Sequence, residues 1–276
     1  MANQRARPPQ RPTPAAAPRD QTRTVILIAA VVAVVAVIGV AIALLVGGGD
    51  DDDEGAVASV PMTEEGLADC SAVPSPSVES AASPGTTPEL AEFPADDIFK
   101  PVAVDGQDLP PFDQEVREGA EPDTALCRAA PIVSGYDYEG NEVTIDPATD
   151  GPTMVVLLAH WCPHCNAEVP VLNEWRVSGE FPDGLNVVGV STGVSADAPN
   201  YPPDEWLVEM DWQWPVLVDD RTPDDGSAPP AMAAYGGTSY PTLVFIDDDG
   251  LVRQRLSGEV PTDVFAPLAE ELVADT

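Results

Sequence analysis

Basic residues are scarce in this chain of 276 residues, which contains 12 lysines and arginines against 47 aspartates and glutamates. Five of the cations precede the first long apolar run: Arg5, Arg7, Arg11, Arg19 and Arg23. The rest of the chain is therefore strongly negative. Because phosphate binding needs clustered lysine and arginine side chains, we expect no nucleic-acid partner. We interpret the acidic surface as a solubility coat or an adaptation to salty surroundings, and a field that steers basic partners is the weaker alternative.

Charge is absent altogether from residues 25–46, VILIAAVVAVVAVIGVAIALLV. At a helical rise of about 1.5 Å per residue, this run is long enough to cross a hydrocarbon core of about 30 Å. Basic residues precede it and the acidic run 50–54 follows it. The positive-inside rule then predicts a cytoplasmic tail over residues 1–24 and an extracytoplasmic remainder. A cleavable signal peptide is the alternative, but its apolar core is normally about 7–15 residues, so we predict an uncleaved single-pass anchor in the plasma membrane.

Residues 47–127 form an acidic segment rich in proline, serine and alanine, with no sustained period of 2 or 3.6. Such a composition buries too little apolar surface to offset the entropy of ordering, so we predict a disordered, extended tether. Cys70 and Cys127 lie in this segment. An even number of cysteines in an oxidising compartment favours a structural disulfide between them. Two free thiols, or a second redox pair that receives electrons from another pair, are the alternatives.

From residue 128 to residue 276 the pattern is that of an alternating α/β domain. Strands are expected at 141–145, 153–161, 185–192 and 214–220, and a hairpin that turns at Asp249-Gly250 is expected over 242–258. Helices are expected at 163–178 with a break at Pro170, at 202–210 and at 262–274.

The stretch WCPHC, residues 161–165, ends a buried strand and opens a helix. A helix N-terminus offers unpaired N–H groups and the positive end of the helix dipole. Cys162 is therefore expected to be partly ionised and able to attack a disulfide, and Cys165, one turn later, to resolve the mixed disulfide. His164 can donate a hydrogen bond to the Cys162 thiolate, which stabilises the reduced form and makes the disulfide more oxidising. The pattern predicts thiol–disulfide exchange.

The same stretch could instead bind a metal, because His160, Cys162, His164 and Cys165 have ligand types that suit zinc or Cu(I). A strand end and a rigid helix start hold these side chains in divergent directions, and structural zinc sites usually need two ligand pairs. We therefore expect no metal and no dissociable cofactor. A membrane-tethered metal-binding or chaperone module is kept as the alternative function, and His160 is expected at the rim of the site.

Residues 161–170, WCPHCNAEVP, resemble the W-C-x-x-C-x-x-E-x-P signature of the membrane-anchored TlpA/ResA-like thiol–disulfide oxidoreductases of the thioredoxin-fold superfamily. Residues 233–252, AAYGGTSYPTLVFIDDDGLV, resemble a second segment of that family, with Gly237 where an apolar residue is usual. The resemblance implies an α/β thioredoxin-like fold with a central mixed sheet flanked by helices. It also implies a cis peptide bond before Pro241.

The same resemblance implies roles for individual residues. Trp161, Tyr240 and Pro241 would bind the partner protein. Glu168 would move protons beside the cysteines, because Val156 stands where thioredoxins carry a buried aspartate; an exposed helix residue is the alternative for Glu168. The implied partners are protein thiols and disulfides, together with a membrane electron donor or acceptor.

Two features of the resemblance leave alternatives open. The Pro-His dipeptide between the cysteines resembles that of DsbA-like oxidases, whereas the surrounding frame resembles that of reductases, so both directions of electron flow stay open. A peroxidase-type redoxin is the competing class of enzyme. A single T-x-x-C cysteine would be expected there, and the C-x-x-C pair argues against it.

Overall fold

The computed structural model describes residues 66–72, 90–91, 93–94, 97–112 and 123–274. The predicted cytoplasmic tail and membrane anchor, residues 1–24 and 25–46, lie outside the described residues. Within those described ranges, no helix combines the length and the apolar character that crossing a membrane requires.

A mixed β-sheet forms the centre of the domain. Its strands lie in the order β1 (Ala103–Asp105), β2 (Ile132–Tyr136), β6 (Val216–Val218), β5 (Asn186–Ser191), β4 (Thr153–Leu158), β7 (Thr242–Ile246) and β8 (Val252–Ser257), and β3 (Glu142–Ile145) pairs with β2. The pairs β4–β5 and β5–β6 are parallel and the other pairs are antiparallel. All six residues of β4 are buried, as expected for a central strand covered on both faces.

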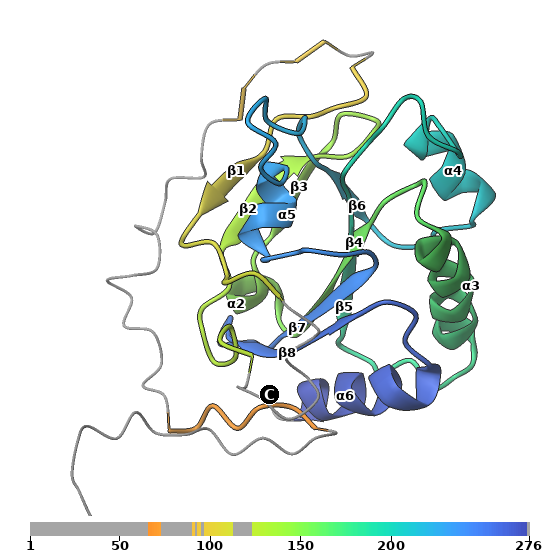
Figure 1. Ribbon diagram of the computed structural model, residues 1–276. Helices are drawn as coiled ribbons and strands as arrows, with labels where there is room; N and C mark the ends of the chain where they lie inside the picture. Colours follow the sequence, from red (N-terminus) through yellow and green to blue (C-terminus); the bar gives the residue numbers. More distant parts are fainter. Residues whose placement is uncertain (1–65, 73–89, 92, 95–96, 113–122, 275–276) are drawn as a thin grey trace, which may run out of the picture. The chain divides into compact units, whose positions relative to one another are not determined.

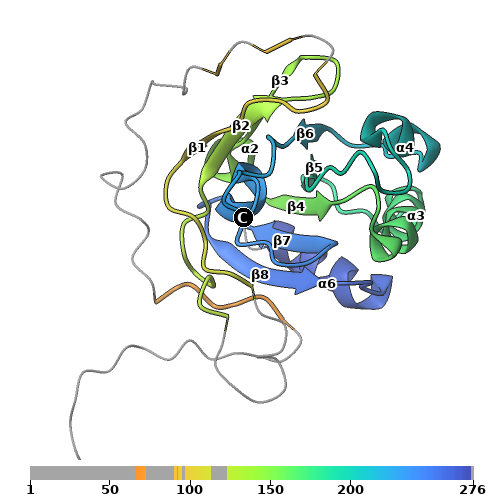
Figure 2. The ribbon, with the colours of Figure 1, turned by 45° about the horizontal axis from the view of Figure 1, so that its top comes forward.

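Helices cover both faces of this sheet (Figures 1 and 2). They are α2 (Pro147–Asp150), α3 (Pro163–Val177), α4 (Pro203–Glu209), α5 (Pro230–Ala234) and α6 (Thr262–Ala274). Alternate residues of β4 and β7 point to opposite faces: one set packs with α3, α4 and α6, and the other packs with α5. This sheet order with helices on both faces is a thioredoxin-like α/β fold, which confirms the fold class implied by the sequence.

The predicted break of a helix at Pro170 is wrong, because α3 continues through that residue. Proline removes one backbone donor and normally costs a helix interior about 3 kcal/mol. Here Val169, Leu172 and Trp175 bury the inner face of α3 against the sheet. Tertiary packing of an apolar face supplies most helix stability in proteins, so it outweighs the lost hydrogen bond.

The C-terminal part of the predicted tether packs against the domain. β1 lies in it and pairs with β2, and Leu109, Phe112 and Ala125 are buried. The prediction of an extended tether is therefore wrong for residues 97–112 and 123–127, and also for residues 66–72, where Leu67 and Ala68 are buried. The apolar residues of this stretch are too sparse to form a period, so their contribution to the core was not visible in the sequence pattern.

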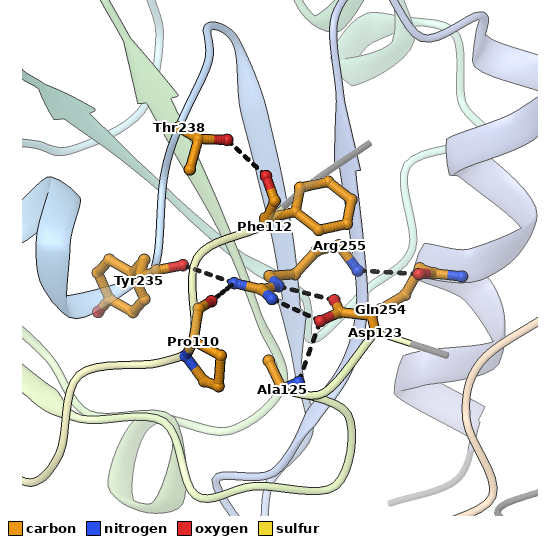
Figure 3. A network of polar contacts seen from close by, with 8 residues as sticks. All are labelled: Pro110, Phe112, Asp123, Ala125, Tyr235, Thr238, Gln254 and Arg255. Carbon is orange, nitrogen blue, oxygen red and sulfur yellow. Dashed lines mark hydrogen bonds and ion pairs between the residues drawn. The ribbon is translucent and has the colours of Figure 1, made fainter. Parts of the chain in front are cut away.

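A buried arginine on β8 holds this segment in place (Figure 3). The Arg255 side chain is fully buried and its guanidinium forms two hydrogen bonds to the Asp123 carboxylate, from Nε at 2.8 Å and from Nη2. Its Nη1 donates to the carbonyl oxygens of Pro110 at 2.8 Å and Tyr235 at 3.2 Å. These bonds offset the cost of burying the charge, because a buried guanidinium is tolerated only when it is paired and its donors are satisfied.

Cys70 and Cys127 form a disulfide with an S–S distance of 2.05 Å, which is the pairing that the sequence favoured. The Cys127 N–H donates to the carbonyl oxygen of Val252, the first residue of β8. The antiparallel register of the sheet places that residue at the edge where β4 begins, whereas Cys162 follows the opposite end of β4. This separation does not favour Cys70–Cys127 as a second redox pair in direct exchange with the first.

Candidate active site

The two free cysteines lie where β4 leads into α3. Cys162 occupies the residue before the helix in an extended conformation, with φ −76° and ψ 121°, and Pro163 begins the helix. The Cys162 carbonyl accepts the N–H of Asn166 at 3.2 Å. Cys162 is 5 % exposed and Cys165 is fully buried. The sulfur at the helix N-terminus is therefore the outer member of the pair, beside N–H groups that the helix leaves unpaired.

The register of the sheet brings the second predicted segment to these cysteines. β4 and β7 are antiparallel with Leu157 opposite Thr242, so residues that precede β7 lie beside residues that follow β4. The peptide bond between Tyr240 and Pro241 is cis, as the resemblance implies. The Cys162 thiol donates to the Tyr240 carbonyl oxygen, with Sγ and oxygen 3.4 Å apart.

Two aromatic side chains flank the outer sulfur. The rings of Trp161 and Tyr240 pack edge to face, with centroids 5.6 Å apart. Trp161 Nε1 donates to the Gly193 carbonyl at 2.7 Å, and the Tyr240 hydroxyl donates to Met232 Sδ at 2.8 Å. Gly193 has φ +60°, and a Cβ there would lie 2.5 Å from the Tyr240 hydroxyl. An alanine at residue 193 would therefore strain the backbone and displace the Tyr240 ring.

Glu168 is buried next to the cysteines. It is 1 % exposed, and its Oε2 accepts the N–H of Val260 at 2.9 Å. Within the described part of the chain, its Oε1 has no hydrogen-bond partner. Burial, with a smaller contribution from the negative charge of Glu259, raises the pKa of Glu168 to about 7, although the Val260 amide opposes this shift. A carboxyl group with a pKa near neutrality can both take and release a proton at physiological pH.

Cys165 lies one turn before Glu168 on α3. Burial raises the pKa of the Cys165 thiol, and the charges of Cys162 and Glu168 raise it further, although a backbone hydrogen bond from Ala159 opposes them. This thiol therefore needs a base before it can act as a nucleophile. Residues three apart on a helix are neighbours on one face, so the Glu168 carboxylate is within the same part of the site.

His164 is exposed and its hydrogen bond goes to an acidic residue that the sequence did not single out. The His164 Nδ1 lies 2.7 Å from Glu259 Oε1, and the two side chains are 62 % and 56 % exposed. In the described ranges, the ring makes no hydrogen bond to Cys162. The effect of His164 on the Cys162 sulfur stays a prediction, and it would act through charge.

The expectation that His160 lies at the rim of the site is wrong, because this residue is fully buried. Its Nδ1 lies 2.8 Å from the Pro199 carbonyl oxygen, and its Nε2 accepts the N–H of Ser195 at 3.2 Å. A carbonyl oxygen can only accept, so Nδ1 carries the proton of a neutral ring. Burial also lowers the pKa of His160. The ring thus fixes the loop that follows β5, which a sequence pattern could not reveal.

The geometry does not favour the metal-binding alternative. Both ring nitrogens of His160 are used in bonds to the backbone. Across residues 66–72, 90–91, 93–94, 97–112 and 123–274, no three or more His, Cys, Asp and Glu side chains are grouped so that they could hold a metal ion.

Glu259 and Val260, which contact two of the predicted site residues, were missed by sequence reasoning. They belong to no motif and follow the last strand of the predicted hairpin. Their position depends on the pairing of Thr242 with Ser257, which places the end of β8 next to the start of β7. The hairpin register was the signal that could have found them. The end of β8 lies beside the cis-proline, and the cis-proline lies beside the cysteines.

Comparison with known proteins gives matches over the same domain. Residues 126–255 match the model of the AhpC/TSA family. The thiol:disulfide interchange protein DsbE of Escherichia coli K12 is 28 % identical over 134 residues, which cover 46 % of this chain and 62 % of that protein. DsbE of Shigella flexneri matches with the same values. The chain therefore spans less than two thirds of the length of these curated relatives.

Solved structures give similar matches. A putative thiol:disulfide interchange protein DsbE from Chlorobium tepidum is 22 % identical, with a TM-score of 0.41, and the match covers 54 % of this chain and 96 % of that one. StoA from Bacillus subtilis is 18 % identical, with a TM-score of 0.38, and the match covers 52 % of this chain and 95 % of that one.

Proposed function

We propose that this protein is an extracytoplasmic thiol–disulfide oxidoreductase that exchanges disulfides with protein substrates through Cys162 and Cys165. One observation carries the proposal: two free thiols share a helix N-terminus, with the outer sulfur against a cis-proline segment and the inner one beside a buried carboxyl group. The curated relatives that match this domain are named thiol:disulfide interchange proteins, which supports the same chemistry.

In the reductive direction, the Cys162 thiolate attacks a disulfide of the partner, forms a mixed disulfide and releases one partner thiolate. The Glu168 carboxylate then takes the proton of the Cys165 thiol, and the Cys165 sulfur attacks the Cys162 sulfur. This step releases the second partner thiolate and leaves an intramolecular disulfide. The partner gains the two electrons that the pair loses, and the reverse sequence oxidises a dithiol partner.

Each neighbouring side chain has a role in these reaction steps. A pKa near 7 lets Glu168 accept the proton of Cys165 without holding it permanently. Trp161 and Tyr240 flank the attacking sulfur and would shape the groove for the partner chain. The segment at Pro241 would orient that chain over Cys162, and a charged His164 would favour the thiolate.

The location of the domain is part of the same proposal. The uncharged run 25–46, with basic residues before it and acidic residues after it, supports a single-pass anchor that leaves the domain outside the plasma membrane. A membrane electron donor or acceptor would then return the cysteine pair to its starting state. Protease treatment of intact spheroplasts is expected to digest the domain, and a domain that resists digestion until lysis would contradict this location.

The redox proposal is tested by equilibrating the full chain with glutathione buffers and alkylating the remaining thiols after an acid quench. Mass spectrometry of the peptide that contains Cys162 and Cys165 separates this pair from Cys70–Cys127. A reversible two-electron couple is expected. A potential of about −120 to −180 mV would identify an oxidant or isomerase, and about −270 mV or lower a reductase. Absence of a reversible couple would refute the proposal, and Cys162→Ser is the matched control.

A further inference from the structure

Two adjacent residues of the loop after β8 contact two side chains of α3 near the cysteine pair, His164 and Glu168. The Glu259 carboxylate contacts His164, with Oε1 and Nδ1 2.7 Å apart. The N–H of the next residue, Val260, donates to Glu168 Oε2 at 2.9 Å. One loop therefore contacts both the histidine between the cysteines and the carboxyl group beside the inner cysteine.

This loop is itself held in place by the cis-proline segment. The N–H of Gly258 donates to the Pro241 carbonyl oxygen at 2.9 Å. The hydroxyls of Ser257 and Ser239 lie 2.6 Å apart in a hydrogen bond. Hydrogen bonds thus hold the chain on both sides of Glu259, so only its side chain has to be ordered to bring the carboxylate to the imidazole ring.

We propose that Glu259 is a positioning residue that holds the His164 ring at the start of α3 through a carboxylate–imidazole contact and thereby shifts the Cys162–Cys165 couple toward its reduced form. The inference rests on the proposed thiol–disulfide exchange. A carboxylate acceptor favours the charged form of a histidine, and hydrogen bonds between charged partners are short and strong. A positive charge near the outer sulfur favours its thiolate, and a stabilised thiolate makes the disulfide more oxidising.

The charge of Glu259 also acts directly, with the opposite sign. A negative charge near a thiol disfavours its thiolate, and the charge of Glu259 contributes to the raised pKa of Glu168. Only the favourable effect passes through His164. Removing the Glu259 charge is therefore expected to lower the ratio of reduced to oxidised cysteine pair when His164 is present. When the imidazole is absent, the same change is expected to raise this ratio or leave it unchanged.

The experiment is a double-mutant cycle on the full chain, with Glu259→Gln, His164→Ala and the double variant. The equilibrium constant of the cysteine pair against glutathione is measured at pH 7 by alkylation and mass spectrometry. Glu259→Gln is expected to lower the ratio of reduced to oxidised pair about two- to fivefold at a fixed glutathione buffer, the range that an exposed ion pair supports. In the His164→Ala background it is expected to leave the ratio unchanged or to raise it. Glu271→Gln, at an exposed residue of α6, removes one charge elsewhere and is expected to leave the ratio unchanged.

Three results would overturn the inference. The ratio of reduced to oxidised pair could be unchanged in Glu259→Gln, it could rise, or it could fall by the same factor with and without His164. The last result would mean that the carboxylate acts without the histidine. Both side chains are exposed, so the variants are expected to fold, and circular dichroism checks this. A wild-type chain without any reversible couple would refute the proposed function instead, so the two failures are distinguishable.

Discussion

The buried carboxyl group of Glu168 predicts that the stability of this domain depends on pH in a specific way. The pKa of Glu168 rises from an ordinary value of 4.5 to about 7 on folding. A carboxyl group whose pKa is raised in the folded state destabilises that state once it ionises. Its penalty is absent below pH 4.5, grows between 4.5 and 7 and is constant above 7. Glu168→Gln removes the penalty, because glutamine keeps the shape but cannot ionise.

The size of the effect follows from the shift. At about 1.36 kcal/mol per pKa unit, the full penalty is about 3 kcal/mol. At pH 5 it is about 1 kcal/mol, because the unfolded carboxyl group is then mostly ionised and the folded one is not. The glutamine side chain of the variant can still accept the Val260 N–H through its amide oxygen. Glu168→Gln is therefore expected to raise the free energy of unfolding over that of its reference by about 2 kcal/mol more at pH 8 than at pH 5.

The assay is urea unfolding followed by tryptophan fluorescence, because all five tryptophans lie between residues 161 and 214. Reference and variant both carry Cys162→Ser, so the Cys162–Cys165 disulfide cannot form and no reductant is needed that would open Cys70–Cys127. Glu174→Gln, at an exposed residue of the same helix, is the control and is expected to show no change with pH. An equal effect of Glu168→Gln at pH 5 and pH 8 would refute the reasoning.

Three further predictions concern the resolving thiol, the buried ion pair of Arg255 and the shape of the groove. Cys165→Ser is expected to accumulate a mixed disulfide with glutathione, visible by mass spectrometry, since the resolving thiol is gone; no adduct would contradict its role. Asp123→Ala leaves the buried guanidinium of Arg255 without its carboxylate and is expected to cost about 3–5 kcal/mol in urea unfolding, with part of the loss recovered when Arg255→Met is added. Gly193→Ala places a Cβ against the Tyr240 hydroxyl and is expected to slow the reaction with oxidised glutathione about tenfold while the domain stays folded, and an unchanged rate would show that the ring position does not matter.

Short-range patterns were sufficient for much of the fold. The continuous apolar run at β4 and the alternation at β3 predicted both strands, because burial on one or two faces imposes those patterns. β1 and α5 span only three and five residues, which is too short to show a period. The segment that contains Leu109 looked like a tether because its composition is poor in apolar residues, yet it is covered by the domain.

The residues of the candidate site could likewise be predicted only in part. Cys162 and Cys165 could be placed at a strand–helix junction from local sequence, whereas the surroundings of their neighbours could not. His160 and His164 lie four residues apart in one stretch, yet one is fully buried and the other is exposed. Burial depends on which loops cover a residue, and no local pattern records that.

By itself, the sequence determined the acidic character of the chain, its apolar run, the α/β alternation and the C-x-x-C pair at the start of a helix. These properties depend on residues that are close together along the chain. Only the tertiary structure decided that Glu168 is buried with a raised pKa and that Glu259 contacts His164. The partners in those contacts are 92 and 95 residues apart, and they meet because β7 and β8 pair in register beside β4. A pKa depends on burial and on nearby charge, and both are set by segments that only folding brings together.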